Sequence, residues 1–425
     1  MGHILVAPDK FKGSATAAEV AGHLAAGVRD AGRHAVELPV ADGGEGTVAA
    51  AVAAGFRPVP VTVCGPTGNP VRARFAIRHG TAVVELATAS GLAQLPAGPA
   101  PLRATSRGTG ELVRGALDAG ATTLVLGVGG SACTDGGAGM LAALGARLLD
   151  ADGAELPDGG AALARLHRID LSGLDGRLAG TRFVLASDVD NPLLGPTGAA
   201  AVYGPQKGAG PREVRVLDAA LARWAAVLGA DGARPGAGAA GGVGFGALTV
   251  LGAQQRTGID VVLDLVGFGE RLGGAALVIT GEGSVDEQTL HGKAPAGVAA
   301  AARSAGVPVA TVCGRSSLRR EQAAGLGTVH VLTEVEPDIA RCVADPGPPL
   351  RVLGRRIAAA ARGRVHTGPL RPAPTSVSAI RSRTLGHSPG SITVVCGVPS
   401  RPCRRTRPCG KVRSTMGDVQ TSAES

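Results

Sequence analysis

Five apolar segments of the chain each end in a short cluster of glycines, carboxylates and hydroxyls. They are residues 3–14, 35–47, 122–137, 182–192 and 275–287. Open α/β sheets bind their ligands in the crevice beyond the carboxyl ends of the strands. The pattern therefore predicts one shared pocket for an anionic, metal-bound ligand, and it favours an enzyme.

The spacing of apolar residues predicts alternating strands and helices from the start of the chain. A strand at 3–7 precedes a helix from Thr16 to about Ala31, for which Ser14 is the expected N-cap. A second strand and a second helix are expected at 35–40 and 47–55. This order is typical of an α/β fold.

Residues 57–92 have a different character. Three short, β-branched segments separated by turn residues predict antiparallel strands and the opening of a second domain. Helices are then expected at 109–120 and 138–149, and Trp224 is expected to be a packing residue. Strands and helices alternate again from residue 275 to a last helix that ends near 361.

Most of the formal net charge of +9 lies at the C-terminal end, where nine Lys or Arg and two Asp or Glu follow residue 364. Its weak apolar patterning predicts a disordered basic tail over 365–425. Aromatic residues make up only 2% of the chain, so we expect no nucleic-acid partner. No apolar run approaches about 18 residues and no signal pattern begins the chain, so we expect no membrane span and a cytoplasmic protein.

Two glycine-rich segments resemble dinucleotide or phosphate loops. Residues 127–132 fit the variant G-x-G-x-x-A between a strand and a helix, with Asp150 about 20 residues further on. They favour either a nicotinamide dinucleotide or a phosphate-binding turn, and the interruption by Cys133–Asp135 favours the turn. Residues 236–241 follow a proline instead of a strand, which indicates a phosphate-binding loop or a plain linker.

Phosphoryl transfer needs cations at the transferred phosphate, carboxylates that hold Mg²⁺, and a group that orients the acceptor hydroxyl. The candidate cations are Lys10, Lys12 and Lys293, and the candidate acids are Asp42, Glu45, Asp135, Asp188, Asp190, Glu282 and Asp286. Acids are common in turns because they bond to local amides. Their recurrence at strand ends is what favours a site.

Six motifs carry a family resemblance. They are APDKFKGS (7–14), ADGGEGT (41–47), GGSACTDGGAGML (129–141), residues 186–209, PGAGAAGGVGFG (235–246) and TGEGSVDEQTLHGKAP (280–295). Together they resemble the type I bacterial glycerate kinase family over about residues 3–362. The resemblance implies ATP- and Mg²⁺-dependent phosphorylation of D-glycerate, with 2-phosphoglycerate as the expected product.

The resemblance also implies two α/β domains with the active site in the cleft. A discontinuous Rossmann-like domain would comprise residues 1–60 and 268–364, and a second α/β domain, residues 61–267, would be inserted in it. The expected oligomeric state is a monomer or a homodimer.

We expect the candidate site residues to have four kinds of role: catalysis, substrate binding, phosphate binding and metal binding. Asp188 follows a strand and precedes Asn191-Pro192, so it is expected to orient or deprotonate the hydroxyl, with Lys10 and Lys293 as the other catalytic residues. The expected substrate-binding residues are Lys12, Asp42, Asn191 and Lys207. The expected phosphate-binding residues are Gly129, Gly130, Ser131, Asp135, Gly238, Gly241 and Gly242. The expected metal-side carboxylates are Glu282, Asp286 and Asp42, of which Mg²⁺ commonly uses only one or two.

Three other classes of function stay open. A nicotinamide-dependent oxidoreductase of a small 2-hydroxy acid would use residues 127–132. A non-catalytic sugar-acid sensor would bind glycerate without turnover, and a related kinase would prefer another small hydroxy acid. A set of acids combined with lysines exceeds what a binding module needs, which favours a kinase.

Overall fold

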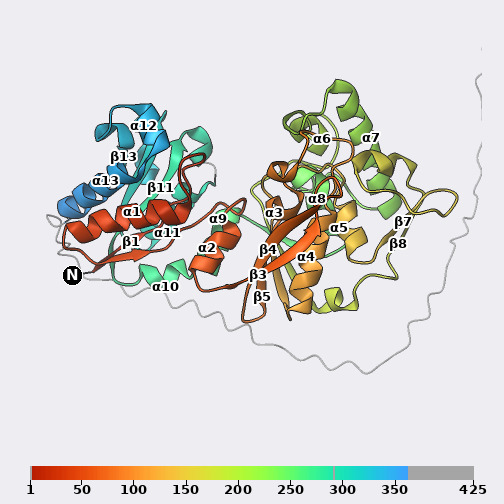
Figure 1. The fold of residues 1–425 in the computed structure, drawn as a ribbon, viewed down its shortest axis with the longest axis horizontal. Coiled ribbons are helices and arrows are strands. Elements are labelled where there is room, and N and C mark those ends of the chain that lie inside the picture. Colours follow the sequence, from red (N-terminus) through yellow and green to blue (C-terminus); the bar gives the residue numbers. More distant parts are fainter. Residues whose placement is uncertain (1, 291, 362–425) are drawn as a thin grey trace, which may run out of the picture. The chain divides into compact units, whose positions relative to one another are not determined.

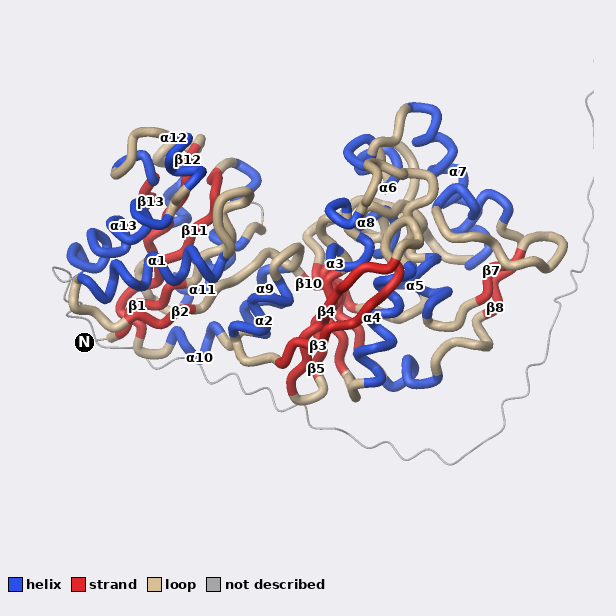
Figure 2. The backbone as a smooth tube through the Cα atoms, in the orientation of Figure 1, coloured by secondary structure: helices blue, strands red, loops and turns tan. Residues whose placement is uncertain are grey.

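The computed structural model describes residues 2–290 and 292–361, which fall within one compact unit of mixed α/β structure (Figures 1 and 2). The predicted tail at 365–425 lies outside the described residues. None of the described helices is long and apolar enough to cross a membrane.

The first sheet takes its strands from both ends of the described chain. All of its strands are parallel, in the order β13 (Thr328–Val331), β12 (Val309–Ser316), β11 (Ala275–Val285), β1 (His3–Val6) and β2 (Ala35–Glu37). Ile4 and Val6 face one side of the sheet and Leu5 faces the other, and all three are fully buried. Burial on both faces explains why β1 is a continuous apolar run.

Helices cover both faces of this sheet. On one face, α1 (Ala17–Asp30) packs against α13 (Gly347–Ala360), with which it lies side by side in Figure 1. On the other face lie α11 (Ala294–Ser304) and α10 (Phe268–Leu272).

The N-cap of α1 is Thr16, so the prediction of Ser14 was wrong. Thr16 Oγ1 accepts a hydrogen bond from Glu19 N at 3.2 Å, and Glu19 Oε2 accepts one from Thr16 N at 2.8 Å. This is a capping box, which satisfies two of the free amides at the helix start. Ser14 instead lies in a turn, where its amide donates to Phe11 O.

The second sheet is mixed. Its order is β10 (Gln254–Arg256), β9 (Arg182–Ala186), β6 (Thr123–Gly127), β5 (Thr81–Glu85), β4 (Pro70–Arg78) and β3 (Arg57–Cys64). The pairs β3–β4 and β4–β5 are antiparallel, which confirms the prediction for residues 57–92, and the other pairs are parallel.

The core beside the second sheet is built mainly from aliphatic side chains, together with Phe75, Phe183, Phe245 and the only tryptophan of the chain. The helices around it are α3 (Ala87–Ser90), α4 (Arg107–Asp118), α5 (Ala138–Ala143), α6 (Ala199–Tyr203), α7 (Pro211–Leu228) and α8 (Ala239–Thr249). Trp224 is fully buried on α7, and its Nε1 donates to Gly136 O at 3.1 Å. The predicted packing role of Trp224 is confirmed.

The helix expected at 138–149 is shorter than predicted. It ends at Ala143, and β7 (Arg147–Leu149) then pairs with β8 (Arg168–Asp170). Gly145 adopts φ +109°, and a Cβ there would lie 2.0 Å from Gly173 O. The close approach of these two loops breaks the helix at a residue that only glycine tolerates.

Two helices pack against both sheets. α2 (Thr47–Ala53) and α9 (Gly258–Leu265) place Ala50 and Val262 in the core of the first sheet, and Val48 and Val261 in the core of the second. Such helices need apolar residues all round. The division of the chain at residues 60/61 and 267/268 stays a prediction.

Candidate active site

A cavity of about 1020 Å³ lies at the carboxyl ends of strands from both sheets. That volume is at the upper end of typical small-molecule sites. Four of the five segments that the sequence singles out supply lining residues, whereas 182–192 does not.

Nine of the candidate residues named from the sequence line the cavity. They are Lys10, Lys12, Asp42, Glu45, Gly129, Gly130, Glu282, Asp286 and Lys293. A second set of polar lining residues was not predicted from the sequence. It comprises Asp9, Ser284, Arg315, Ser316 and Thr333. Gly314-Arg315-Ser316 ends β12 with the same glycine and polar residues as the other strand ends, so that signal was present in the sequence.

The loop after β1 carries two of the lysines. The strand's pairing continues past Val6, since Asp9 N donates to Gly281 O at 2.8 Å. Phe11 and Ala15 then exchange two backbone hydrogen bonds of 2.9 Å and close a turn in which Gly13 has φ +80°. This tight turn fixes where Lys10 and Lys12 leave the backbone.

Glycines bring the loops of the two sheets into backbone contact. A Cβ on Gly129 would lie 2.8 Å from Gly44 Cα, and one on Gly258 would lie 1.9 Å from Asp42 O. Any side chain at these positions would force the loops apart. The absence of a Cβ is therefore what places Asp42 beside the 129–130 turn.

Four carboxylates gather at the first sheet's end of the cavity. Burial raises the pKa of Asp9 to about 7, and the charges of Asp42 and Glu282 push that pKa in the same direction. Burial also raises the pKa of Glu282, with Asp286 and Asp42 adding to the shift. Lys293 partly balances this charge, because its Nζ lies 3.9 Å from Glu282 Oε2 and 3.8 Å from Asp286 Oδ1.

Lys10 is held beside the start of α2. Its ammonium donates to Glu45 O and lies 3.9 Å from Glu45 Oε2. Buried Glu85, at the end of β5, accepts hydrogen bonds from Gly46 N at 2.9 Å and Val48 N at 2.6 Å. A carboxylate at this position caps the positive end of the helix, and it adds negative charge close to Lys10.

The donor set fits a divalent cation that keeps most of its own water or phosphate ligands. Among the described residues, no three His, Cys, Asp or Glu side chains are arranged to hold a metal together. Mg²⁺ is usually bound through one or two carboxylates plus substrate phosphates. Burial is the largest cause of the raised pKa of Glu282, and the charges of Asp286 and Asp42 add to it, so a bound cation would offset the repulsion that Glu282 experiences.

Asp188 lies beside the lined cavity. It follows β9, whose last residue is in register with Gly127 of β6. Its Oδ1 accepts a hydrogen bond from Gly258 N at 3.0 Å, and within the described residues its Oδ2 has no partner. Burial raises the pKa of Asp188, and the nearby charge of Asp42 adds to the shift.

Lys207 is outside the cavity lining and only 1% exposed. Its Nζ donates to Ser131 Oγ at 2.8 Å and to Cys133 O at 2.6 Å. The contact anchors the loop directly after Gly130, which does line the cavity. Lys207 and Ser131 thus hold the glycine turn, and neither lines the cavity.

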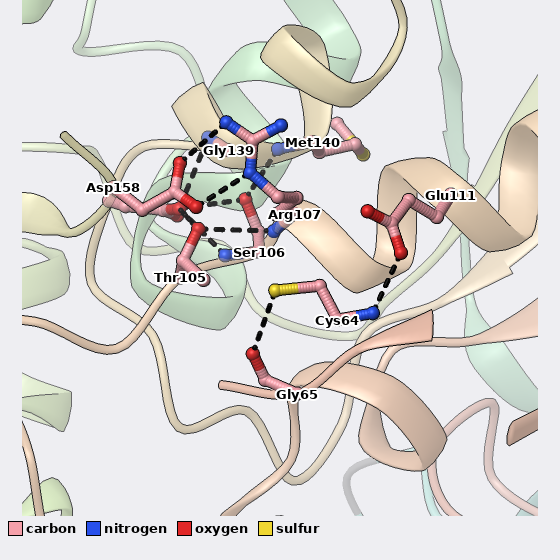
Figure 3. A network of polar contacts seen from close by, with 10 residues as sticks. Cys64, Gly65, Thr105, Ser106, Arg107, Glu111, Gly139, Met140 and Asp158 are labelled. Carbon is pink, nitrogen blue, oxygen red and sulfur yellow. Dashed lines mark hydrogen bonds and ion pairs between the residues drawn. The ribbon is translucent and has the colours of Figure 1, made fainter. Parts of the chain in front are cut away.

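Asp135 is also buried, at the centre of a hydrogen-bond network. It accepts from Ser106 N at 2.7 Å, Ser106 Oγ at 2.8 Å and Gly139 N at 3.2 Å. Figure 3 shows the same neighbourhood, where Arg107 pairs with Asp158 through two hydrogen bonds of 2.6 and 2.9 Å. These contacts join the starts of α4 and α5.

The remaining predicted residues make structural contacts. Asn191 donates from Nδ2 to Thr197 O at 2.8 Å, and its Oδ1 accepts from Tyr203 OH at 2.7 Å. Gly238, Gly241 and Gly242 are absent from the lining, and each packs on neighbouring backbone: a Cβ on Gly241 would lie 2.1 Å from Cys133 O.

Comparisons with known proteins give a consistent result. The model of the glycerate kinase family matches residues 4–362. The chain is 50% identical over 325 residues to a Bacillus subtilis protein named glycerate kinase, covering 74% of this chain and 85% of the relative. It is 47% identical over 324 residues to glycerate 2-kinase of Escherichia coli, covering 73% and 84%.

A solved structure agrees with the sequence relatives. A Salmonella typhimurium LT2 protein described as glycerate kinase 2 superposes with a TM-score of 0.75 at 43% identity, covering 85% of this chain and 98% of that one. This chain therefore belongs to the glycerate kinase family.

Proposed function

We propose that the protein transfers the γ-phosphoryl group of ATP to a hydroxyl of D-glycerate, with 2-phosphoglycerate and ADP as products. The observation that carries the proposal is the lined cavity itself, where lysines, an arginine and several carboxylates converge at the carboxyl ends of parallel strands from both sheets. Family membership and the names of the relatives point to the same substrate.

Catalysis of phosphoryl transfer rests on positioning and on stabilising charge. Lys10 and Lys293 lie among the carboxylates and are placed to balance the charge of the transferred phosphate. The Gly129–Gly130 turn lines the same cavity, and backbone amides of such a glycine turn are suited to phosphate oxygens. Lys12, which is exposed at the cavity, is suited to the carboxylate of the acid.

Asp188 is our candidate for the group that accepts the hydroxyl proton. Oδ1 is held by Gly258 N, so the carboxylate is oriented before substrate arrives and Oδ2 is left to accept a hydrogen bond. A raised pKa makes the carboxylate a stronger base than an ordinary aspartate. On this proposal the 2-hydroxyl proton passes to Asp188 as the hydroxyl oxygen bonds to the γ-phosphorus and ADP leaves.

A bound Mg²⁺ would supply positive charge that offsets the charge developing on the phosphate oxygens. Asp42 and Glu282 are the residues we expect to hold it, directly or through water, because both line the cavity and the charge of Asp42 adds to the burial that raises the pKa of Glu282. Asp286 would then pair mainly with Lys293, from which it lies 3.8 Å.

The test is steady-state kinetics of Asp188→Asn against the matched control Asp190→Asn, two residues along the same loop. Loss of a general base commonly costs about 10²–10⁴-fold in kcat, so Asp188→Asn should lose that much while Asp190→Asn stays near wild type. Equal, small effects of both changes would remove Asp188 from the mechanism. No phosphorylation of D-glycerate by folded wild type would overturn the whole proposal.

The structure does not favour the nicotinamide alternative. A dinucleotide fingerprint leads directly into a helix whose N-terminus receives the pyrophosphate. Here α5 begins only at Ala138, after the loop that Lys207 and Asp135 hold, and it is six residues long.

A further inference from the structure

One end of the cavity is apolar, in contrast to the rest of its lining. Ile339 and Val343 on α12 (Ile339–Ala344) are 67% and 53% exposed, the highest values among the exposed large apolar side chains of the described residues. Both line the cavity, as do Val331 and buried Leu332. Solvated aliphatic side chains inside a polar site indicate a surface that a ligand covers.

Strand order sets where this end lies relative to the charged groups. Val331 of β13 is in register with Cys313 of β12, which is in register with Glu282 of β11. Adjacent strands lie about 4.8 Å apart, so Val331 and Glu282 are separated by about 10 Å across the sheet. The site therefore runs along the sheet edge from the apolar residues Val331 and Leu332 at the end of β13, through Arg315 on β12, to the carboxylates at the ends of β11, β1 and β2.

D-glycerate bound beside Glu282 would not contact apolar side chains about 10 Å away at Val331. It is a three-carbon acid whose carbons all carry oxygen, and it would sit where its hydroxyl reaches the transferred phosphate. A nucleoside triphosphate has the complementary order: a flat base with apolar faces, a ribose, two phosphates and then the transferred one. The apolar end and the charged end of the cavity match the two ends of such a molecule.

Resting on the proposed function, we propose that Ile339 and Val343, with Val331 and Leu332, form the subsite for the purine base of the nucleotide. Arg315 then contacts the non-transferred phosphates. Arg315 is exposed, and its Nε donates to Ser284 Oγ at 3.0 Å, which turns the guanidinium along the sheet edge between the two ends. This direction also places the acid substrate at the far end, near Asp42 and the Gly129 turn.

The experiment uses calorimetric binding of three probes: MgADP, adenosine and tripolyphosphate. Two variants are compared with wild type: the double variant Ile339→Ser with Val343→Ser, and the single variant Arg315→Gln. Val216→Ser is the matched control, since Val216 is 38% exposed on α7 and lines no part of the cavity. The serine double variant should weaken MgADP and adenosine about tenfold and leave tripolyphosphate unchanged. Arg315→Gln should weaken tripolyphosphate and MgADP and leave adenosine unchanged.

Steady-state turnover tests the base subsite separately from the kinase activity. With D-glycerate, the serine double variant should raise KM for ATP about tenfold, with KM for glycerate and kcat within twofold of wild type. Normal turnover together with unchanged MgADP binding in that variant would overturn the base subsite while the kinase stands. Absence of turnover in wild type would sink the proposed function, and the adenosine measurement would still decide where a base binds.

Discussion

The buried ammonium of Lys207 makes folding stability depend on alkaline pH. Burial lowers the pKa of Lys207 from 10.5 to about 8, while the nearby Cys133 and Asp135 oppose the shift. Between these two values the unfolded chain holds the Lys207 proton and the folded chain releases it. The free energy of unfolding therefore rises with pH across this window, and the contribution is lost as pH falls through the folded pKa.

The magnitude follows from the shift. One pKa unit corresponds to about 1.4 kcal/mol, so a fall from 10.5 to about 8 is worth about 3 kcal/mol for a side chain that is only 1% exposed. Lys207→Met keeps the apolar stem and removes the titration. It also leaves Ser131 Oγ and Cys133 O without their donor, which is a cost that does not vary with pH.

The assay is urea unfolding of wild type and Lys207→Met, followed by circular dichroism, from pH 7.5 to 10.5. The difference in unfolding free energy, wild type minus variant, should grow by about 3 kcal/mol over that range. Lys12→Met, at an exposed lysine, is the control and should give a flat difference. A flat difference for Lys207→Met as well would show that its ammonium is solvated and would refute the burial argument.

Three further changes have definite expected outcomes. Gly129→Ala places a Cβ 2.8 Å from Gly44 Cα, so kcat/KM should fall at least about tenfold; steady-state kinetics checks it. Thr16→Ala removes half of a capping box and should cost about 1 kcal/mol of stability without changing kcat, by urea unfolding and kinetics. Asp135→Ala leaves Ser106 N and Gly139 N buried without an acceptor, so it should lower the unfolding free energy by about 3 kcal/mol or more, against a smaller loss for Asp135→Asn, which keeps one acceptor oxygen.

Much of the fold could be predicted from local patterns. Ile4, Leu5 and Val6 form a continuous apolar run because both faces of β1 are covered, and the turns between 57 and 92 identified antiparallel strands. The errors arose where distant contacts override local preference. The break after Ala143 depends on Gly173, which is far along the chain from Gly145.

Some residues of the candidate site could likewise be predicted from local patterns, whereas others depend on distant contacts. Lysines and acids that follow β1, β2 and β11 reach the cavity because parallel strands end at one edge. The burial of Lys207 could not be predicted from local sequence, since its hydrogen-bond partners Ser131 and Cys133 lie more than 70 positions away. The glycines at 238–242 read as an open amide loop, whereas their lack of side chains serves close packing against Cys133 and Gly136.

Phosphoryl transfer to D-glycerate can be observed by phosphorus NMR of D-glycerate incubated with MgATP and wild type, run beside Asp188→Asn. We expect ADP and a new phosphoglycerate signal that is greatly reduced in the variant. A phosphate on carbon 2 couples to one proton and gives a doublet, whereas one on carbon 3 couples to two. A doublet would support 2-phosphoglycerate as the product. The absence of any new phosphoglycerate signal with folded wild type would contradict the proposed phosphorylation of D-glycerate.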